Sequence, residues 1–153
     1  MGLIPAFTPE QIISTARSWI GTPYRHRVVK KGRNGGADCV GLVIGVYNEL
    51  YGESVGKIRE YTPWWAEETG EELMVELMRS HRHSIELGRD ELGPGDIFVL
   101  RMKYNGPAKH CGFVSFNNQI IHAYSGHAVL ETDWPAGWKR RIRYGFRFGK
   151  AVE

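Results

Sequence analysis

The period of the hydrophobic pattern changes once along this chain of 153 residues. In the first half, apolar side chains recur at every third or fourth position, which is the spacing of an amphipathic helix. From Gly93 onward, short apolar and aromatic runs are bounded by glycine, proline and asparagine, which is typical of strands. Because the helices come first and the strands follow, we expect an α+β fold with an antiparallel sheet.

Three helices are predicted before Gly93. The first opens on the capping sequence Thr8-Pro9-Glu10-Gln11, which has a threonine cap followed by proline at the first helical position, and it ends at Gly21. The second begins near Cys39 and ends at Gly52, and its apolar residues on adjoining faces predict burial. The third covers residues 67–78.

Five strands are predicted in the second half, so we expect the helices to pack on an antiparallel sheet of five to six strands. In the last strand, arginines alternate with apolar and aromatic residues, which predicts a basic face toward solvent. These arginines are Arg141, Arg143 and Arg147. The five strands cover residues 97–101, 111–116, 120–124, 128–132 and 140–148.

Composition limits the classes to which the protein can belong. The length fits one domain, residues 1–153, with one core. A hydrophobic content of 42% and a charged content of 24% are ordinary for a globular protein. The formal net charge of +3 is too small to indicate a nucleic-acid partner. Two cysteines cannot build a disulfide framework. Cys39 and Cys111 could form a single bridge, which a chain of this length does not require, so we expect two free thiols.

Neither a secretory signal nor a membrane span is predicted. The first residues have no basic run before a sustained apolar stretch. No segment approaches the roughly 20 apolar residues that cross a bilayer. We therefore expect a protein that is made in the cytoplasm and does not insert into membranes. If its substrate lies elsewhere, something else must carry it there.

Cys39 lies where a glycine-rich loop gives way to an apolar helix. The unpaired N–H groups and the positive dipole end of a helix N-terminus lower the pKa of a thiol. An imidazole, from His110 or His122, would lower it further. Alternatively, Cys39 is a small buried hydrophobic residue and the two histidines are hydrogen-bonded core residues. The joint occurrence of the three favours a cysteine nucleophile with its base.

Four other histidines raise the question of a metal site. Their spacing is poor for zinc, and His81 and His83 lie in a polar stretch that is typical of a solvated turn. The other two are His26 and His127. We therefore expect neither a metal nor any other cofactor.

Five short motifs around the candidate residues occur in the order of one family. They are Trp19-Ile20-Gly21-Thr22-Pro23-Tyr24, Gly36-Ala37-Asp38-Cys39-Val40-Gly41-Leu42, Gly95-Asp96-Ile97-Phe98, His110-Cys111-Gly112-Phe113-Val114 and Ile121-His122-Ala123. With these motifs the chain resembles the NlpC-type cysteine peptidases, papain-like hydrolases of bacterial cell-wall peptides, and more closely their phage-tail and gene-transfer-agent members. The resemblance covers roughly residues 8 to 148.

The resemblance implies a role for each matching residue. Cys39 matches the nucleophile, His110 the general base, and His122 the polar residue that orients the base. Tyr24 matches a tyrosine near the oxyanion position, and Asp38 an acidic residue associated with binding the stem peptide. The family commonly cleaves the bond between D-glutamate, through its γ-carboxyl, and a diamino acid. This chain has valine directly after the nucleophile, where the family often has a serine that contacts substrate.

The two histidines constrain the hairpin between them. Side chains alternate between the faces of a strand, so a plain two-residue turn at Asn117-Asn118 would place His110 and His122 on opposite faces. We therefore predict an odd-length loop or a bulge near residues 116–119. Cys111, next to His110, should then face the other way and pack in the core.

Hypotheses of more than one class are compatible with these features. The first is an active endopeptidase that is carried in a phage-like tail tip, opens the wall locally and contacts tail-tip or hub proteins. The second is a structural tail module with little or no activity. An amidase or acyltransferase is a third, because hydrolysis and transfer pass through the same thioester. The basic residues 139–150 are expected to be a solvated face that could touch an anionic wall polymer or a tail protein.

Overall fold

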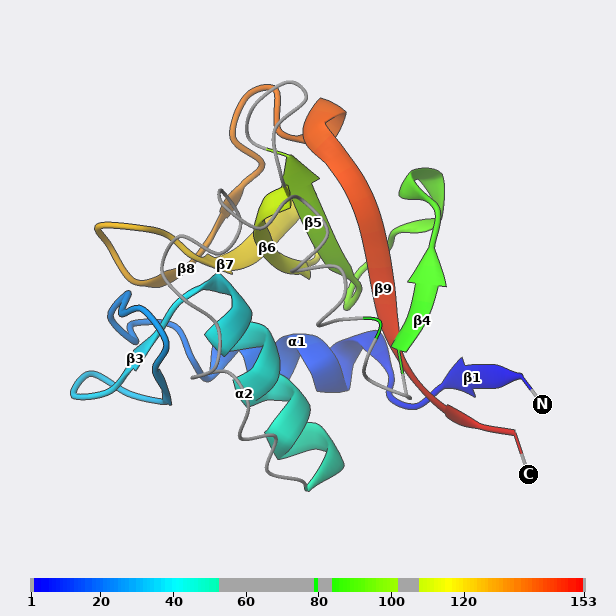
Figure 1. The fold of residues 1–153 in the computed structure, drawn as a ribbon, viewed down its shortest axis with the longest axis horizontal. Helices are drawn as coiled ribbons and strands as arrows, with labels where there is room; N and C mark the ends of the chain where they lie inside the picture. Colours follow the sequence, from blue (N-terminus) through cyan, green and yellow to red (C-terminus); the bar gives the residue numbers. More distant parts are fainter. Residues whose placement is uncertain (1, 53–78, 80–83, 102–107, 153) are drawn as a thin grey trace.

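The computed structural model describes residues 2–52, 79, 84–101 and 108–152. The helix expected over 67–78 and the pair His81 and His83 lie outside the described residues. Figure 1 shows two described helices, α1 (Pro9–Arg17) and α2 (Cys39–Tyr51), against one face of an antiparallel sheet. In the described part of the chain, no helix is long and apolar enough to span a membrane.

The sheet has seven strands within the described residues. Its order is β1-β9-β5-β6-β7-β8, and β4 also pairs with β9. A separate two-stranded sheet joins β2 to β3 (Figure 1). The strands are β1 (Leu3–Pro5), β2 (Val29–Lys30), β3 (Gly36–Ala37), β4 (Ser84–Leu87), β5 (Ile97–Arg101), β6 (Ala108–Val114), β7 (Gln119–Ala123), β8 (Val129–Asp133) and β9 (Ile142–Ala151).

The α+β fold class is confirmed, and the sheet has seven strands where five to six were expected. The predicted strand 97–101 matches β5, and the other four differ from the observed strands by one to three residues at their ends. The strands that sequence reasoning missed are short. β1, for example, has three exposed residues and gains its hydrogen bonds from β9, so no hydrophobic period marks it.

The sheet separates two hydrophobic cores. The helix-side core lies between the helices and the sheet and includes Ile13, Leu42 and Phe113. The smaller outer core, on the opposite face, is formed by Phe98, Leu100, Ile120, Trp138 and Ile142. Residues 134–142 cover this outer face, so both faces of the central strands are buried.

Close contact between the two helices depends on a glycine. The Trp19 ring lies against Gly45 of α2, and a Cβ atom added there would come within 2.3 Å of the ring. The indole Nε1 of Trp19 also donates a hydrogen bond of 2.5 Å to Glu49 Oε1 on α2. These contacts fix the position of α2, which begins at Cys39.

Val114 at the end of β6 pairs with Ile120 of β7, so Ser115 falls opposite Gln119 and three residues, 116–118, form the turn between them. Ser115 N donates to Gln119 O at 2.8 Å, which closes the turn. Asn117 and Asn118 have φ values of 57° and 61°, in the left-handed region that asparagine tolerates better than most residues. The predicted odd-length loop is confirmed.

The register that follows from this turn places the two histidines on one face. Val114 lies opposite Ile120, so His122 falls opposite Gly112, two residues from His110. Because side chains alternate along a strand, His110 and His122 share the face of the outer core.

The prediction of a basic solvent face on the last strand was partly wrong. Arg143 is exposed, but the Nε and Nη2 atoms of Arg147 each donate a 2.7 Å hydrogen bond to the carboxylate of Asp96. Asp96 is 2% exposed, so its charge needs this partner. Arg141 lies in the short 3-10 helix η3 (Lys139–Arg141), before the strand begins.

We predict that Gly45→Ala lowers the free energy of unfolding by about 1–3 kcal/mol, because the added methyl group overlaps the Trp19 ring. Urea denaturation would measure the change. Alanine favours helix over glycine by about 1 kcal/mol, so a gain in stability would contradict the overlap. The control is the same substitution in a Trp19→Ala background, where it should cost less.

Candidate active site

Asp38 fixes the start of α2. It is the N-cap residue, and its Oδ1 accepts a 2.8 Å hydrogen bond from Gly41 N in the first turn. Its Oδ2 accepts another 2.8 Å bond from Arg27 N, which ties the helix start to the preceding loop. Cys39 therefore occupies the first position of α2 and is 6% exposed.

The pKa of Asp38 is raised to about 7. Burial is the main cause, and the negative charge of Cys39 adds to it, whereas the backbone N–H bonds act in the opposite direction. His26 Nδ1 lies 3.8 Å from Asp38 Oδ2. A negative charge on Cys39 thus disfavours a negative charge on the neighbouring Asp38 carboxyl.

The environment of Cys39 favours the thiolate. Its pKa is lowered well below the ordinary value, first by a hydrogen bond from the Cys111 side chain and then by a hydrogen bond and the positive charge of His110. Burial acts against these effects. A thiolate at a helix N-terminus beside an imidazole is a strong nucleophile.

Cys111 packs in the helix-side core, as expected from its position next to His110. It is fully buried, and its hydrogen bond to Cys39, together with burial, raises the pKa of its own thiol. Cys111 therefore keeps its proton, and its S–H group donates a hydrogen bond to the Cys39 sulfur. Sequence reasoning missed this contact because nothing in the local pattern shows which residue of α2 lies over β6.

The two histidines are hydrogen-bonded to each other. His110 Nε2 lies 3.0 Å from His122 Nδ1, and the Trp138 ring contacts both imidazoles. His122 is 2% exposed. Burial, followed by the charge of His110, lowers the pKa of His122 to about 3. His122 is therefore neutral and can orient His110 without competing for its proton.

Thr132 on β8 determines which nitrogens carry the protons. Its hydroxyl donates to Asp133 O at 2.9 Å, and its Oγ1 lies 3.3 Å from His122 Nε2. Because the hydroxyl proton is used, Oγ1 must accept from His122 Nε2–H. Nδ1 of neutral His122 then accepts from His110 Nε2–H. Nδ1 of His110 remains to exchange a proton with Cys39.

Gly112 leaves room for this arrangement. A Cβ atom there would lie 2.9 Å from both His122 Cβ and Phe98 Cζ and 2.7 Å from Ile121 O. The glycine of the His110-Cys111-Gly112 motif is thus required by the close approach of β7.

The Tyr24 phenol is close enough to Cys39 for the charge of the thiolate to affect its pKa. Burial and then the charges of Cys39 and Asp38 raise the pKa of its phenol, which keeps the hydroxyl protonated. Its backbone forms a bridge with Ala37, two residues before Cys39. A neutral phenol at this place can donate to an oxyanion, and that role of Tyr24 stays a prediction.

The structure brings the predicted residues together where the start of α2, which carries Cys39, meets β6 and β7. His110 lies near the start of β6, and His122 lies near the end of β7. The structure adds the hydrogen bond of Cys111 to Cys39 and the contact of Thr132 with His122, which sequence reasoning missed. Thr132 could have been found only from the strand register, because it pairs with Ile120 on the face that His122 shares. The set has the components of acyl transfer: a thiolate, an imidazole with a fixed tautomer and candidate oxyanion donors.

Comparison with known proteins gives one distant sequence relative. No family model matches the chain. A curated protein from Escherichia coli (strain K12), described as "Probable endopeptidase NlpC", is 25% identical over 116 residues. The aligned region is 76% of this chain and 62% of that protein, so the chain spans about three fifths of the relative's length.

Solved structures share the fold. The NlpC/p60 domain of peptidoglycan hydrolase SagA has a TM-score of 0.58 at 20% identity, covering 91% of this chain and 97% of that one. NlpC1 from Trichomonas vaginalis has a TM-score of 0.63 at 20% identity, covering 97% and 46%. An NlpC/p60 family protein from Bacillus cereus ATCC 10987 has 0.62 at 16% identity, covering 95% and 41%. The chain has the papain-like NlpC/p60 fold that the sequence predicted.

We predict that Thr132→Val raises the pH midpoint for alkylation of Cys39 by iodoacetamide by about one unit, the equivalent of one lost hydrogen bond. Valine keeps the methyl group but cannot accept from His122. The rate would be followed by mass spectrometry of the peptide that contains Cys39.

Thr132→Ser is the matched control because it keeps the hydroxyl and loses the methyl group. A positioning role through the hydroxyl predicts a wild-type midpoint for the serine variant. If Thr132 acted only by packing, the ranking would be reversed, with valine near wild type.

We predict that His122 makes the fold sensitive to acid. Its folded pKa of about 3 lies below the unfolded value of 6.5, so its contribution is present above pH 6.5 and is lost as the pH falls toward 3. The free energy of unfolding of wild type, minus that of His122→Gln, should rise by about 1 kcal/mol per unit between pH 4 and 6. Urea denaturation at each pH would measure it.

Asp38 acts in the opposite direction over part of this range, because its folded pKa of about 7 lies above its ordinary 3.8. Its contribution is present below pH 3.8 and is lost as the pH rises toward 7. Taking the difference between variants at each pH cancels this contribution. A difference that does not change with pH would contradict a neutral, buried His122.

Proposed function

We propose that this chain is a cysteine endopeptidase that cleaves the stem peptides of peptidoglycan. The observation that carries the proposal is the hydrogen-bond chain from Thr132 through His122 to His110, which lies beside Cys39 and helps to lower the pKa of its thiol. The substrate class is supported by the names of similar proteins, a "Probable endopeptidase NlpC" and a domain of a peptidoglycan hydrolase.

The first half of the reaction forms a thioester. The Cys39 thiolate attacks the carbonyl carbon of the scissile peptide bond, and backbone N–H at the start of α2, with the Tyr24 hydroxyl, stabilises the oxyanion. His110 donates its Nδ1 proton to the leaving amine as the C–N bond breaks. His122 and Thr132 hold the ring through its Nε2, which leaves Nδ1 for the exchange with Cys39.

The second half consumes water. His110 Nδ1 accepts a proton from a water molecule, which attacks the thioester carbonyl. The tetrahedral intermediate collapses, the C–S bond breaks, and the acid product leaves with the Cys39 thiolate restored. If an amine or alcohol attacks the thioester in place of water, the enzyme is an acyltransferase, and if water attacks a thioester formed from another amide, it is an amidase. Both are alternatives on this scaffold.

The bond we propose is the one between the γ-carboxyl of D-glutamate and a diamino acid. Asp38 lies beside the nucleophile, and we propose that its carboxylate contacts the stem peptide in addition to capping α2. Val40, where the family often has serine, is 1% exposed and packs in the helix-side core. Selectivity for the stem peptide must therefore come from residues other than Val40.

We further propose that the protein works in a phage-like tail tip or gene-transfer particle, docked on hub proteins that deliver it to the wall. This setting rests on the sequence resemblance described above. The other candidate is a structural tail module without activity. The hydrogen-bond chain disfavours this structural role, because assembly contacts do not require a buried thiol of lowered pKa next to an imidazole with a fixed tautomer.

The test is digestion of purified peptidoglycan that contains a diamino acid, followed by mass spectrometry of the released fragments. Wild type is expected to release new stem-peptide fragments, and Cys39→Ala to lose at least about 10³-fold in rate. Thr132→Val should fall between the two. Folding of each variant would be checked by circular dichroism. No cleavage by folded, reduced wild-type protein would favour the structural tail module.

A further inference from the structure

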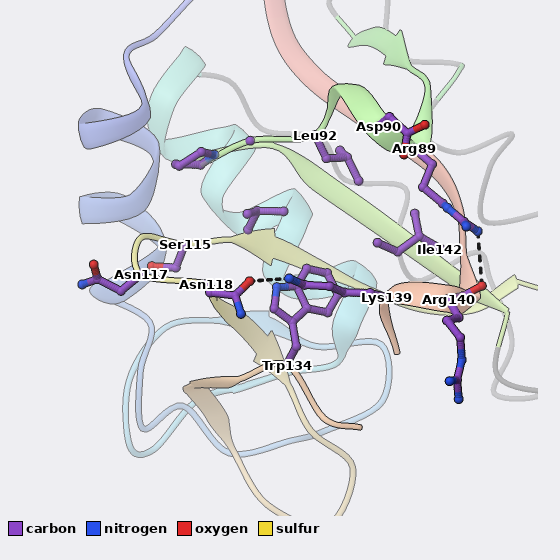
Figure 2. Close-up of a pocket in the computed structure, with 13 residues that line it drawn as sticks. Arg89, Asp90, Leu92, Ser115, Asn117, Asn118, Trp134, Lys139, Arg140 and Ile142 are labelled. Carbon is purple, nitrogen blue, oxygen red and sulfur yellow. Dashed lines mark hydrogen bonds between the residues drawn. The ribbon is translucent and has the colours of Figure 1, made fainter. Parts of the chain in front are cut away.

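The outer face of the sheet carries two adjoining hollows that the mechanism does not use. The larger, of about 530 Å³, extends from η2 (Arg89–Glu91) across to η3, and Figure 2 shows Trp134 among the residues that line it. The smaller, of about 260 Å³, lies next to it. Both are lined by Asn118, Trp134, Lys139 and Arg140, and we call the two together the Trp134 groove.

The charged residues of the Trp134 groove are mostly basic. Arg89, Lys139 and Arg140 line it together with a single carboxylate, Asp90. Arg89 Nη1 donates to Arg140 O at 3.3 Å, and Lys139 Nζ donates to Asn118 Oδ1 (Figure 2). Among the described residues, none of these three cations is bonded to a carboxylate, so their charge is available to an anionic ligand.

The outer core supports the Trp134 ring of the groove. Trp134 is half-buried and packs on Phe98 of the outer core, with ring centroids 4.9 Å apart. Lys139 Nζ lies 5.8 Å from the centre of the indole ring. The indole is thus an apolar surface held by the outer core, with Lys139 over its ring and the hydrogen-bonded Asn118 lining the same groove.

We propose that the Trp134 groove binds an anionic saccharide chain. A sugar ring offers an apolar C–H face that fits an indole, and its hydroxyl and amide groups fit the side chain of Asn118. A carboxylate or phosphate on the sugar fits the arginines, whose planar guanidinium groups bind such anions in two-point contacts. Two hollows that share one aromatic residue suit consecutive units of a chain.

The groove lies on the same face of the sheet as the catalytic histidines. Phe98 packs on Trp134 on one side and on His110 on the other, where the ring centroids are 6.4 Å apart. No residue that lines the groove belongs to the proposed catalytic set. A saccharide chain bound here through a unit that carries no peptide would hold the polymer while a peptide branch from another unit reaches Cys39. The identity of the polymer as wall material rests on the proposed function.

The test is a titration of the isotope-labelled protein followed by NMR. N-acetylmuramic acid supplies a carboxylate on an amino sugar, N-acetylglucosamine 1-phosphate supplies a phosphate, and neutral N-acetylglucosamine supplies no charge. We expect shifts at the Trp134 indole N–H and at the backbone of Lys139 and Arg140. At least one anionic sugar should bind about tenfold more tightly than the neutral one.

Two double variants separate the groove from net charge. Lys139→Glu with Arg140→Glu should weaken the anionic sugar at least about tenfold. Arg143→Glu with Lys150→Glu makes the same charge change at exposed positions of β9 outside the groove and should bind like wild type. Trp134→Phe keeps the packing on Phe98 and removes the indole, so its binding should also weaken.

The results of the titration decide which polymer the groove binds and whether the proposal stands. Stronger binding of the carboxylate sugar assigns the groove to units of the glycan strand whose muramic carboxylate carries no peptide, and stronger binding of the phosphate sugar assigns it to a phosphate-bearing wall polymer. The proposal is overturned if no sugar shifts the groove, if the neutral sugar binds equally well, or if inorganic phosphate alone binds as tightly. It is also overturned if the shifts lie at the catalytic residues.

Because binding is measured without turnover, its failure is distinguishable from failure of the proposed hydrolysis. If the sugars bind and wild type cleaves nothing, the groove stands and the endopeptidase does not. If both stand, Lys139→Glu with Arg140→Glu should cleave a short soluble stem peptide at the wild-type rate and insoluble peptidoglycan more slowly. Equal loss on both substrates would contradict a role limited to holding the polymer.

Discussion

A three-residue turn between β6 and β7 decides on which face each residue of these strands lies. With one residue fewer, His122 would face the helix-side core and His110 would lose its partner. The turn is possible because two successive asparagines adopt left-handed conformations. The 3.0 Å contact between the imidazoles, the alignment with Thr132 and the role of Gly112 all depend on this register.

Burial helps to decide which group of the site carries a negative charge. Three acidic groups, the Asp38 carboxyl and the thiols of Cys39 and Cys111, share a region with little solvent, where separate negative charges repel strongly. The charge is most stable on Cys39, because His110 and the Cys111 proton both face it. The neighbouring groups thus favour the one ionisation state in which the nucleophile can react.

The parts of the fold that sequence predicted are those fixed by local chemistry. The capping box at Thr8 and the change from loop to helix at Cys39 can be read from a few adjacent residues. The parts that it missed depend on contacts between distant segments. The sequence pattern of β9 predicts that Arg147 faces solvent, because its buried partner, Asp96, is far away in sequence. The contacts of Cys111 with Cys39 and of Thr132 with His122 are hidden from sequence for the same reason.

Trp138 joins two regions that were described separately. Its ring contacts both imidazoles, and its backbone leads directly into η3, which supplies Lys139 and Arg140 to the Trp134 groove. One short segment thus serves two regions. Because the Trp138 ring packs against the imidazoles, the catalytic pair also holds the start of η3 in place, and with it the backbone that carries these two cations of the groove.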